Sequence, residues 1–459
     1  MNALYVICGL GIVALVAEIM SLKKWLTAVM MAGLIIATGL VVLDWGTDAS
    51  YFNGMVVFDK FSLAFTALIS IASIFWFWMF GDYFKDAHQT DKSALVLFAV
   101  AGAVIMASFN NMAMLFLGIE ILSISLYTLA GSRKGSLFSN EASFKYFLMG
   151  SFATGFLLLG IAFVYGATGS FHIDKISDFI LIHKEALPGF FYAGVILMFI
   201  GLAFKISAVP FHFWAPDVYS GSPTSITAFM STVVKIAAIA AFFRVFSFAF
   251  AEIESSWLII IEVVCFLTLV LANITAVYQN DAKRMLAFSS VGHVGYILLA
   301  FLADPVTSSS LILYYLSAYA VSSLGAFAIL TVIERDQNSL YIDSFNGLFK
   351  RNPFMAVAMT IALLSLAGIP PLPGFFGKYM VFALALENGF IGLVCVAVVT
   401  SLIGAYYYFR IIIAMFMKEP LGVAPTELSF SEKMLTTALI VLTILIGVFP
   451  NWLISLIGS

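Results

Sequence analysis

The chain has 459 residues, of which 62% are hydrophobic and only 10% are charged, whereas soluble globular proteins carry about 25% charged residues. A water-soluble enzyme is therefore excluded. The formal charge of -3, from 22 Lys and Arg against 25 Asp and Glu, offers no basic field for nucleic acid, so nucleic-acid binding is excluded as well.

Motifs for cofactors and metals are missing from the sequence. Cys8, Cys265 and Cys395 are far apart and each lies inside an apolar run, which fits neither a disulfide framework nor an iron-sulfur site. The stretch from Gly9 to Ala14 matches a dinucleotide pattern, but no strand precedes it. We therefore expect no cofactor and no metal in this chain.

The elements are predicted to be membrane-spanning helices from the start of the chain. The first apolar run, Leu4 to Met20, lacks a basic leader and is followed by Lys23 and Lys24, the reverse of the charge order in a secretory signal. A helix needs about 20 apolar residues to cross a bilayer, and about fourteen runs approach that length. A very short polar turn at Asn110–Asn111 separates the fourth run from the fifth. The runs lie at 3–22, 25–43, 58–81, 93–108, 112–130, 141–168, 187–208, 224–247, 255–279, 283–303, 308–334, 352–386, 388–417 and 432–457.

Basic residues between these runs gather on one side when successive connections are placed on alternate faces. About thirteen lie on one side: Lys23, Lys24, Lys85, Lys92, Arg133, Lys134, Lys283, Arg284, Arg335, Lys350, Arg351, Lys418 and Lys433. The other side has Lys60, Lys175, Lys184 and Arg244. Because positive charge stays in the cytoplasm, this asymmetry predicts an even number of helices and both termini outside.

Two spans are broken by proline, in residues 201–220 and 365–384. Proline removes a backbone donor and clashes with the preceding turn, so each helix is predicted to break and to leave carbonyls that need polar partners. A shift of 163 positions lays Pro373 on Pro210. Broken helices at matching places in two halves are typical of inverted-repeat transporters, whose ion sites lie at the breaks.

We therefore predict an all-α polytopic membrane protein with two inverted five-helix repeats and broken helices 7 and 12. Residues 1–92 are predicted to form an N-terminal three-helix segment. The first repeat is assigned to 93–250, with helices 4–8, and the second to 251–417, with helices 9–13. Residues 418–459 then hold the C-terminal helix 14.

Several charged residues fall inside predicted spans, and the main candidates among them are Glu120, Lys145, Lys205, Lys235 and Lys378. A charge near the bilayer centre costs at least about 2.5–3.5 kcal/mol and is by default a functional candidate. An amine that loses hydration holds its proton less strongly, and a nearby carboxylate restores the affinity. Pairing of Glu120 with Lys205 would then switch the lysine's proton, and Lys235 would pass it toward Lys378, as in a proton wire.

Each candidate also has a structural interpretation. Glu120 could be only an ion-pair partner of one lysine, Lys145 could extend its amine to the cytoplasmic surface, and Lys378 could cap carbonyls freed by the break. His293, about ten residues into its span, is either a relay or a core histidine with satisfied hydrogen bonds. His212 next to Pro210 is similar.

Other ionisable residues near helix ends are predicted to serve mainly as anchors. These are Glu18, Arg244 and Arg410, whereas Glu262, some seven residues inside its span, is a weaker candidate for an acid on the exit side.

Three segments carry a family resemblance: LFLGIEILSISLY at 115–127, GLAFKISAVPFHFWAPDVYSGSPT at 201–224 and GIPPLPGFFGKYMVF at 368–382. They resemble the antiporter-like subunits of proton-pumping NADH:quinone oxidoreductase, respiratory complex I. The resemblance covers nearly the whole chain and implies fourteen helices in two inverted repeats. Residues implied to conduct protons are the glutamate of helix five (Glu120) and the lysines of helices six (Lys145), seven (Lys205), eight (Lys235) and twelve (Lys378), with His293 on the central hydrophilic axis.

The resemblance also implies partners. FMN, iron-sulfur clusters and quinone are expected in other subunits, with subunits K and M as neighbours, A, H, J and L in the same arm, and lipids around them. The location implied is the inner membrane of a bacterium. Two alternatives stay open: the large subunit of a cation/proton antiporter, which would depend on sodium or potassium, and a membrane subunit of an energy-converting hydrogenase.

Overall fold

The computed structural model describes residues 1–17, 19, 23–80, 88–420 and 427–458. Glu18 and Lys85, which the sequence analysis placed at a helix end and among the basic residues of one side, lie outside the described residues. The described chain is almost wholly helical, as predicted. A single short antiparallel pair of strands, β1 (Ala49–Tyr51) and β2 (Val56–Phe58), is the sheet found within these ranges.

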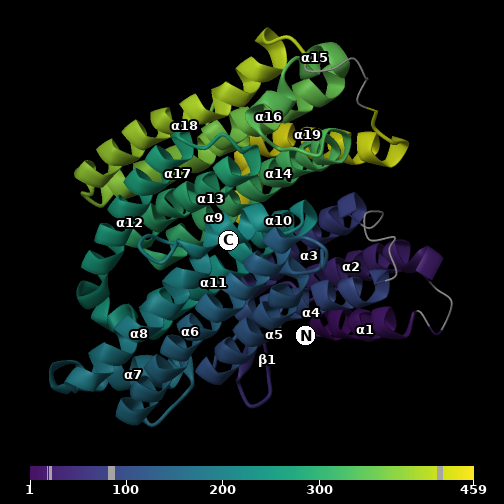
Figure 1. Ribbon diagram of the computed structural model, residues 1–459. Coiled ribbons are helices and arrows are strands. Elements are labelled where there is room, and N and C mark those ends of the chain that lie inside the picture. Colours follow the sequence, from purple (N-terminus) through teal and green to yellow (C-terminus); the bar gives the residue numbers. More distant parts are fainter. Residues whose placement is uncertain (18, 20–22, 81–87, 421–426, 459) are drawn as a thin grey trace. The chain divides into compact units, whose positions relative to one another are not determined.

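Helices occupy all fourteen predicted runs (Figure 1). In the described chain, 12 helices are long and apolar enough to cross a membrane. The short α1 and the broken pair α16 and α17 fill the two remaining runs. The α-helices are α1 Asn2–Val16, α2 Leu26–Leu43, α3 Lys60–Phe80, α4 Gln89–Ser108, α5 Met112–Ala130, α6 Leu137–Thr168, α7 Ile173–His183, α8 Gly189–Ile206, α9 Trp214–Gly221, α10 Thr224–Phe229, α11 Lys235–Arg244, α12 Glu254–Val277, α13 Ala282–Leu298, α14 Pro305–Gln337, α15 Leu348–Arg351, α16 Pro353–Ala367, α17 Pro373–Glu387, α18 Ile391–Met417, α19 Phe430–Val448 and α20 Pro450–Gly458.

Contacts divide the chain into two compact units. The first unit contains Met1–Ser207 and Val233–Ile260, and the second contains Ala208–Thr232 and Ile261–Ser459. This division follows packing, whereas the repeat boundaries predicted after residues 92, 250 and 417 follow sequence symmetry. Those boundaries remain predictions.

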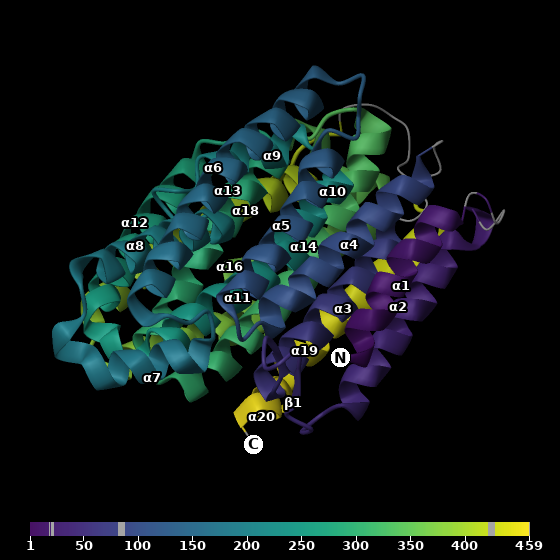
Figure 2. The same ribbon diagram turned by 90° about the horizontal axis from the view of Figure 1, so that it is seen from below.

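Close helix packing in the first unit depends on small residues. Helices α1 to α4 lie side by side (Figure 2). A Cβ atom added to Gly102 of α4 would lie 2.7 Å from the carbonyl oxygen of Gly118 on α5, and one added to Gly160 of α6 would lie 2.7 Å from that of Gly194 on α8. Small residues let helix backbones approach closely, which is a main source of packing where lipid removes the hydrophobic driving force.

The polar turn between α4 and α5 forms where the sequence predicts it. The Asn111 side chain caps α5 by accepting a hydrogen bond from the backbone N–H of Ala113. The Asn110 side-chain amide donates to the carbonyl of Gly54 and to Asp174, at 3.3 and 2.8 Å. The turn therefore ties the strand pair to α7, a short helix that buries Ile173, Ile176 and Ile180 and lies in a segment predicted to be a connection between spans.

Both predicted breaks are present. Helix α8 ends at Ile206, and α16 ends at Ala367 with Gly368 following at φ +85°. Glycine adopts this left-handed conformation at little cost, so it suits the end of a helix. The two central lysines differ in position: Lys205 lies in the last turn of α8, before its break, whereas Lys378 lies on α17, after its break.

Helix α14 is the centre of the second unit. It spans 33 residues and packs against α16, α17, α19 and α20 (Figure 1). Nearly all of its residues between Ser308 and Ile333 are buried, including several serines and tyrosines. Several of these hydroxyls have partners inside the protein: those of Ser317 and Thr331 donate to carbonyls one turn earlier on α14. The buried hydroxyls of Ser308 and Ser310 have no hydrogen-bond partner among the described residues.

Candidate functional site

Lys205 is buried at the end of α8, with 5% of its surface exposed. Its Nζ donates a hydrogen bond of 2.8 Å to the Ser123 hydroxyl on α5, and Ser123 donates in turn to the carbonyl of Ile119 at 2.5 Å. The Nζ atom also lies 5.9 Å from the ring centroid of Tyr127. Ser123 and Tyr127 are one helical turn apart, so one face of α5 supplies both contacts.

Glu120 lies on the same face of α5, one turn before Ser123, and is half-buried. It is near enough for its charge to act on Lys205. Among the ion pairs within 4.0 Å in the described chain, however, none joins Glu120 to Lys205. In this conformation the Lys205 ammonium is therefore bound by a neutral hydroxyl, and direct pairing with Glu120 remains a prediction.

Lys235 is the first residue of α11 and is 2% exposed. The π-helical turn Met230–Val234 precedes it, and α11 packs against α3, α4 and α8 of the same unit. Wide helical turns of this kind occur often at functional sites. The structure thus places Lys235 inside the first unit, on a helix that contacts the one carrying Lys205.

A partly buried ion pair lies at the other end of α11. The Arg244 guanidinium donates to both carboxylate oxygens of Asp59, at 3.3 and 3.0 Å. Asp59 also accepts hydrogen bonds from the Ser62 backbone and hydroxyl, at 2.7 and 2.6 Å. Burial alone would raise the pKa of Asp59, but the Arg244 charge and these hydrogen bonds outweigh it, so the pKa lies below its usual value. Arg244 thus holds the end of α11 to the start of α3, and its predicted role as a membrane anchor stays a prediction.

Lys145 differs from the other lysines in exposure. Its side chain is 40% exposed on α6, where Nζ lies 2.7 Å from Glu141, one turn earlier. The structure therefore does not bring Lys145 into the buried group around Lys205, and its role in proton conduction stays a prediction.

Lys378 spans the second break. Its Nζ donates to the carbonyl of Ala367, the last residue of α16, at 2.8 Å and to the Ser401 hydroxyl on α18 at 2.9 Å. It also lies 4.7 Å from the ring centroid of Tyr296. The amine thus satisfies a carbonyl freed by the break, where the partial negative charge of a helix C-terminus favours a cation. The Lys378 amine could therefore cap the Ala367 carbonyl and also exchange protons, because one role does not exclude the other.

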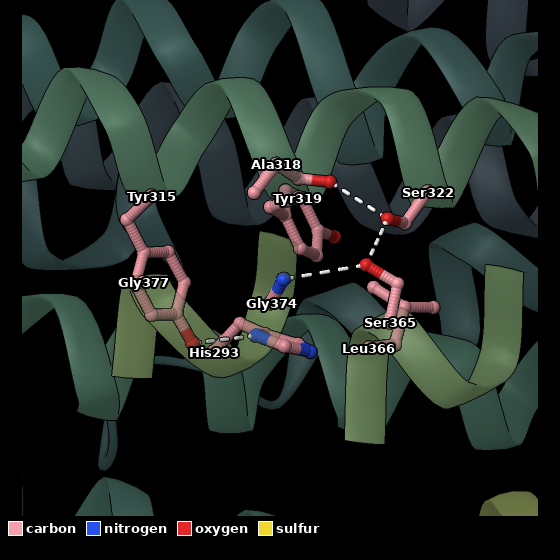
Figure 3. Close-up of a pocket in the computed structure, with 9 residues that line it drawn as sticks. All are labelled: His293, Tyr315, Ala318, Tyr319, Ser322, Ser365, Leu366, Gly374 and Gly377. Atoms are coloured by element: carbon pink, nitrogen blue, oxygen red, sulfur yellow. Dashed lines mark hydrogen bonds between the residues drawn. The ribbon is translucent and has the colours of Figure 1, made fainter. Parts of the chain in front are cut away.

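His293 lies in a group of hydroxyls in the second unit. Its Nδ1 is 2.8 Å from the Tyr315 hydroxyl of α14, and its Nε2 is 3.2 Å from the Tyr408 hydroxyl of α18. A small cavity with room for about one water molecule adjoins His293, Tyr315 and Tyr319 (Figure 3). These tyrosines are not among the residues predicted from the sequence. The available sequence signal was the four-residue spacing of Tyr315 and Tyr319, which places both side chains on one face of a helix.

The secondary candidates separate by location. His212 is buried in the first break, and Glu262 is half-buried on α12. The Arg410 guanidinium donates to the carbonyls of Val277 and Gln279, at 2.5 and 3.0 Å, so it anchors the end of α12. Within the described residues, no group of three or more His, Cys, Asp or Glu side chains is placed to hold a metal ion.

Two broken helices with membrane-buried lysines at their breaks define an antiporter-like membrane protein. Residues 108–404 match the family described as NADH:quinone oxidoreductase/Mrp antiporter, TM. The chain is 43% identical to NADH-quinone oxidoreductase subunit N of Cytophaga hutchinsonii, over 99% of each chain, and 43% identical to that of Flavobacterium psychrophilum, over 100% of each. A chain of respiratory complex I from Thermus thermophilus with bound aureothin superposes with a TM-score of 0.84 at 31% identity, covering 100% of both chains.

The chain belongs to the subunit N family of NADH:quinone oxidoreductase, respiratory complex I. It is an antiporter-like, proton-translocating subunit and a multi-pass membrane protein of the bacterial complex. The predicted family and fold are confirmed.

Proposed function

We propose that protons cross this subunit through Glu120, Lys205, Lys235 and Lys378, with His293 as a relay, driven by quinone reduction in other subunits. The observation that carries the proposal is the burial of three lysines in apolar helices, at 5%, 2% and 6% exposure for Lys205, Lys235 and Lys378. Such amines are costly to keep in a membrane protein. Proton exchange gives a reason for keeping all three.

The Lys205 environment supports a switch. A serine hydroxyl can accept a hydrogen bond from an ammonium and can donate one to a neutral amine. Ser123 can therefore hold Lys205 in both protonation states. It accepts from the ammonium while its own O–H donates to the Ile119 carbonyl, and the O–H would turn from that carbonyl to donate to the neutral amine. Approach of the Glu120 carboxylate would favour the charged amine, and its withdrawal would favour release of the proton.

Lys378 is the corresponding group in the second unit. Like Ser123, the Ser401 hydroxyl can accept a hydrogen bond from the lysine or donate one to it. The Ala367 carbonyl can only accept, so it needs an N–H on the lysine. An amine retains N–H donors after it loses one proton, so the cap on Ala367 survives release. Lys235 and Lys378 are proposed to act at successive stages of the transfer, and Lys145, being half-exposed, to exchange protons at the margin of the buried group.

Orientation and partners are part of the proposal. The excess of basic residues on one side supports a cytoplasmic location for that side, and with it the proposal that both termini lie outside, in the bacterial inner membrane. Subunits K and M are the proposed neighbours, with A, H, J and L in the same arm. FMN, iron-sulfur clusters and quinone are assigned to other subunits of the complex.

Proton translocation by the assembled complex, reconstituted into vesicles, tests the function. We expect NADH oxidation to acidify one compartment with or without sodium or potassium. A strict requirement for either cation would instead favour the antiporter alternative, and nickel without flavin in the purified assembly would favour the hydrogenase.

A further inference from the structure

The second unit contains a continuous line of hydroxyl and imidazole groups that joins three helices. It runs from Ser289 on α13 to Tyr408 on α18, back to His293 on α13, and on to Tyr315 on α14. Ser289 and Tyr408 are joined by a short hydrogen bond. The three larger side chains are almost fully buried, with exposures of 4% for His293, 3% for Tyr315 and 1% for Tyr408.

Each ring nitrogen of His293 faces a different tyrosine, and this determines which hydrogen bonds the ring can donate and accept. A neutral imidazole has one N–H donor and one acceptor nitrogen. One of the two tyrosines must therefore donate to His293 while the other accepts from it. Exchange of the ring tautomer reverses both bonds and leaves the ring neutral.

We propose that Tyr408 and Tyr315 are relay residues that pass a proton through His293 by this exchange, toward the cavity beside α17. The inference rests on the proposed function and adds the residues through which protons would move within the second unit. It requires no charged histidine, which suits a site shielded from solvent.

The proton count along the line balances. The O–H bond of Tyr408 breaks as its proton forms an N–H bond with Nε2, and the Nδ1–H proton moves to the Tyr315 oxygen. Tyr315 gives its original proton to a water in the cavity, while Ser289 gives its proton to Tyr408 and takes one from a water molecule that reaches it from the N-terminal end of α13. One proton enters and one leaves, and each group regains its starting composition. The imidazole is left with its proton on Nε2 instead of Nδ1. Before the next transfer in the same direction, the ring must leave both hydrogen bonds, give the Nε2 proton to water in the cavity that it lines and take one from that water at Nδ1, while the hydroxyls rotate back.

At the cavity that ends the line, α17 lies close to the Tyr315 ring of α14. A Cβ atom on Gly377 would lie 3.0 Å from the Tyr315 ring, so the missing side chain lets α17 approach this ring. Ser365, which also lines the cavity, accepts hydrogen bonds from the Ser322 hydroxyl at 2.7 Å and from the Gly374 N–H at 3.4 Å (Figure 3). The cavity therefore offers polar partners to a water molecule and borders the helix that carries Lys378.

The position of the line along α13 agrees with a supply route to Lys378. Ser289, His293 and Tyr296 follow one another at helical spacing, and the ring of Tyr296 lies under the Lys378 amine. The helix begins near Lys283 and Arg284, on the side predicted to face the cytoplasm. Protons would thus move from that end of α13 toward the level of Lys378.

Phenylalanine variants of the assembled complex test the relay. Tyr408→Phe and Tyr315→Phe each remove one hydroxyl and keep the ring, and we expect each to lower proton translocation about tenfold or more. Because both changes interrupt one line, the double variant should be no slower than the slower single variant. A purely structural role would give losses that add. The matched control is Tyr314→Phe, which removes a buried hydroxyl that donates to Ile446 outside the line.

The outcomes separate the relay from the general function. Parental translocation by both single variants, with Lys378→Ala inactive, would disprove the relay and leave the proposed function intact. Parental translocation by Lys378→Ala as well would contradict the proposed function itself. If a tyrosine variant fails to assemble, Ser289→Ala interrupts the same line with a smaller change: a loss comparable to tenfold supports the relay, and an unchanged rate refutes it.

Discussion

Lys378 donates a hydrogen bond to the carbonyl of Ala367, eleven residues earlier, and thereby connects the two helices on either side of the second break. The same amine reaches the Ser401 hydroxyl on α18. A residue that holds the break together is thus also the residue proposed to exchange protons there. Changes in its protonation would act directly on the geometry of α16 and α17.

Replacement of Lys378 separates these two roles. Lys378→Ala should abolish most proton translocation and also destabilise the complex, because the Ala367 carbonyl loses its donor. Lys378→Arg keeps a donor for that carbonyl but does not release its proton, so it should restore assembly without restoring translocation. Thermal stability and translocation, measured on the same preparations, check this. Recovery of translocation in the arginine variant would show that charge alone is sufficient.

The hydroxyl beside Lys205 should matter for translocation. Ser123→Ala removes the acceptor of the Lys205 hydrogen bond, and we expect translocation to fall about three- to tenfold, a loss of roughly 0.7–1.4 kcal/mol. Ser125→Ala is the control, since that buried hydroxyl donates only to the carbonyl of Ile121 on its own helix. Equal rates for the two variants would remove Ser123 from the path.

Glu120 is predicted to control the proton on Lys205 although no ion pair joins them in this conformation. Glu120→Gln should therefore reduce translocation about as strongly as loss of the lysine, whereas Glu120→Asp, which keeps the charge on a shorter side chain, should retain part of it. Translocation coupled to NADH oxidation is the measurement. A glutamine variant with full activity would leave Glu120 with a structural role.

The Arg244–Asp59 pair predicts a pH dependence of stability. Because the pKa of folded Asp59 lies below the usual value of about 3.9, the pair stabilises the fold above about pH 4, and this stabilisation is lost as the pH falls through the folded-state pKa. Asp59→Asn should cost about 1–3 kcal/mol at pH 7, less than for a fully buried pair because Asp59 is 35% exposed.

Thermal unfolding of the complex at several pH values measures this difference. Asp59→Asn should lower Tm at pH 7 and bring the variant closer to the parent at acid pH. Asp91→Asn is the control, because its carboxylate is 62% exposed and its ion pair with His88 lies on the surface. A parental Tm for Asp59→Asn would mean that the pair does not stabilise the fold.

The sequence was sufficient to predict features that have a local chemical signature. Apolar runs gave the helices, prolines gave both breaks, and Lys205, Lys235 and Lys378 were identified because charge is rare in such runs. Contacts between distant residues had no such signature. Arg244 and Asp59 are 185 positions apart, so no spacing rule predicts that they pair.

Hydroxyl groups explain most of what the sequence did not reveal. Serine and tyrosine are common in membrane helices, and only packing shows which of them meet a lysine or a histidine. Ser123 and Tyr408 therefore became visible in the structure alone. The sequence also did not show which lysines are exposed. Lys145 and Lys205 both occur in apolar runs, yet the Lys145 side chain is half-exposed and Lys205 is buried.

Proton translocation by Lys205 variants tests the central claim most directly. The assembled complex carrying Lys205→Ala or Lys205→Arg is reconstituted, and protons moved per NADH oxidised are compared with those of the parent and of Lys175→Ala, an exposed lysine on α7. We predict a strong loss for both Lys205 variants, since neither side chain can bind and release a proton, and parental behaviour for the control. Near-parental translocation by both Lys205 variants would contradict the claim that protons move through the buried lysines.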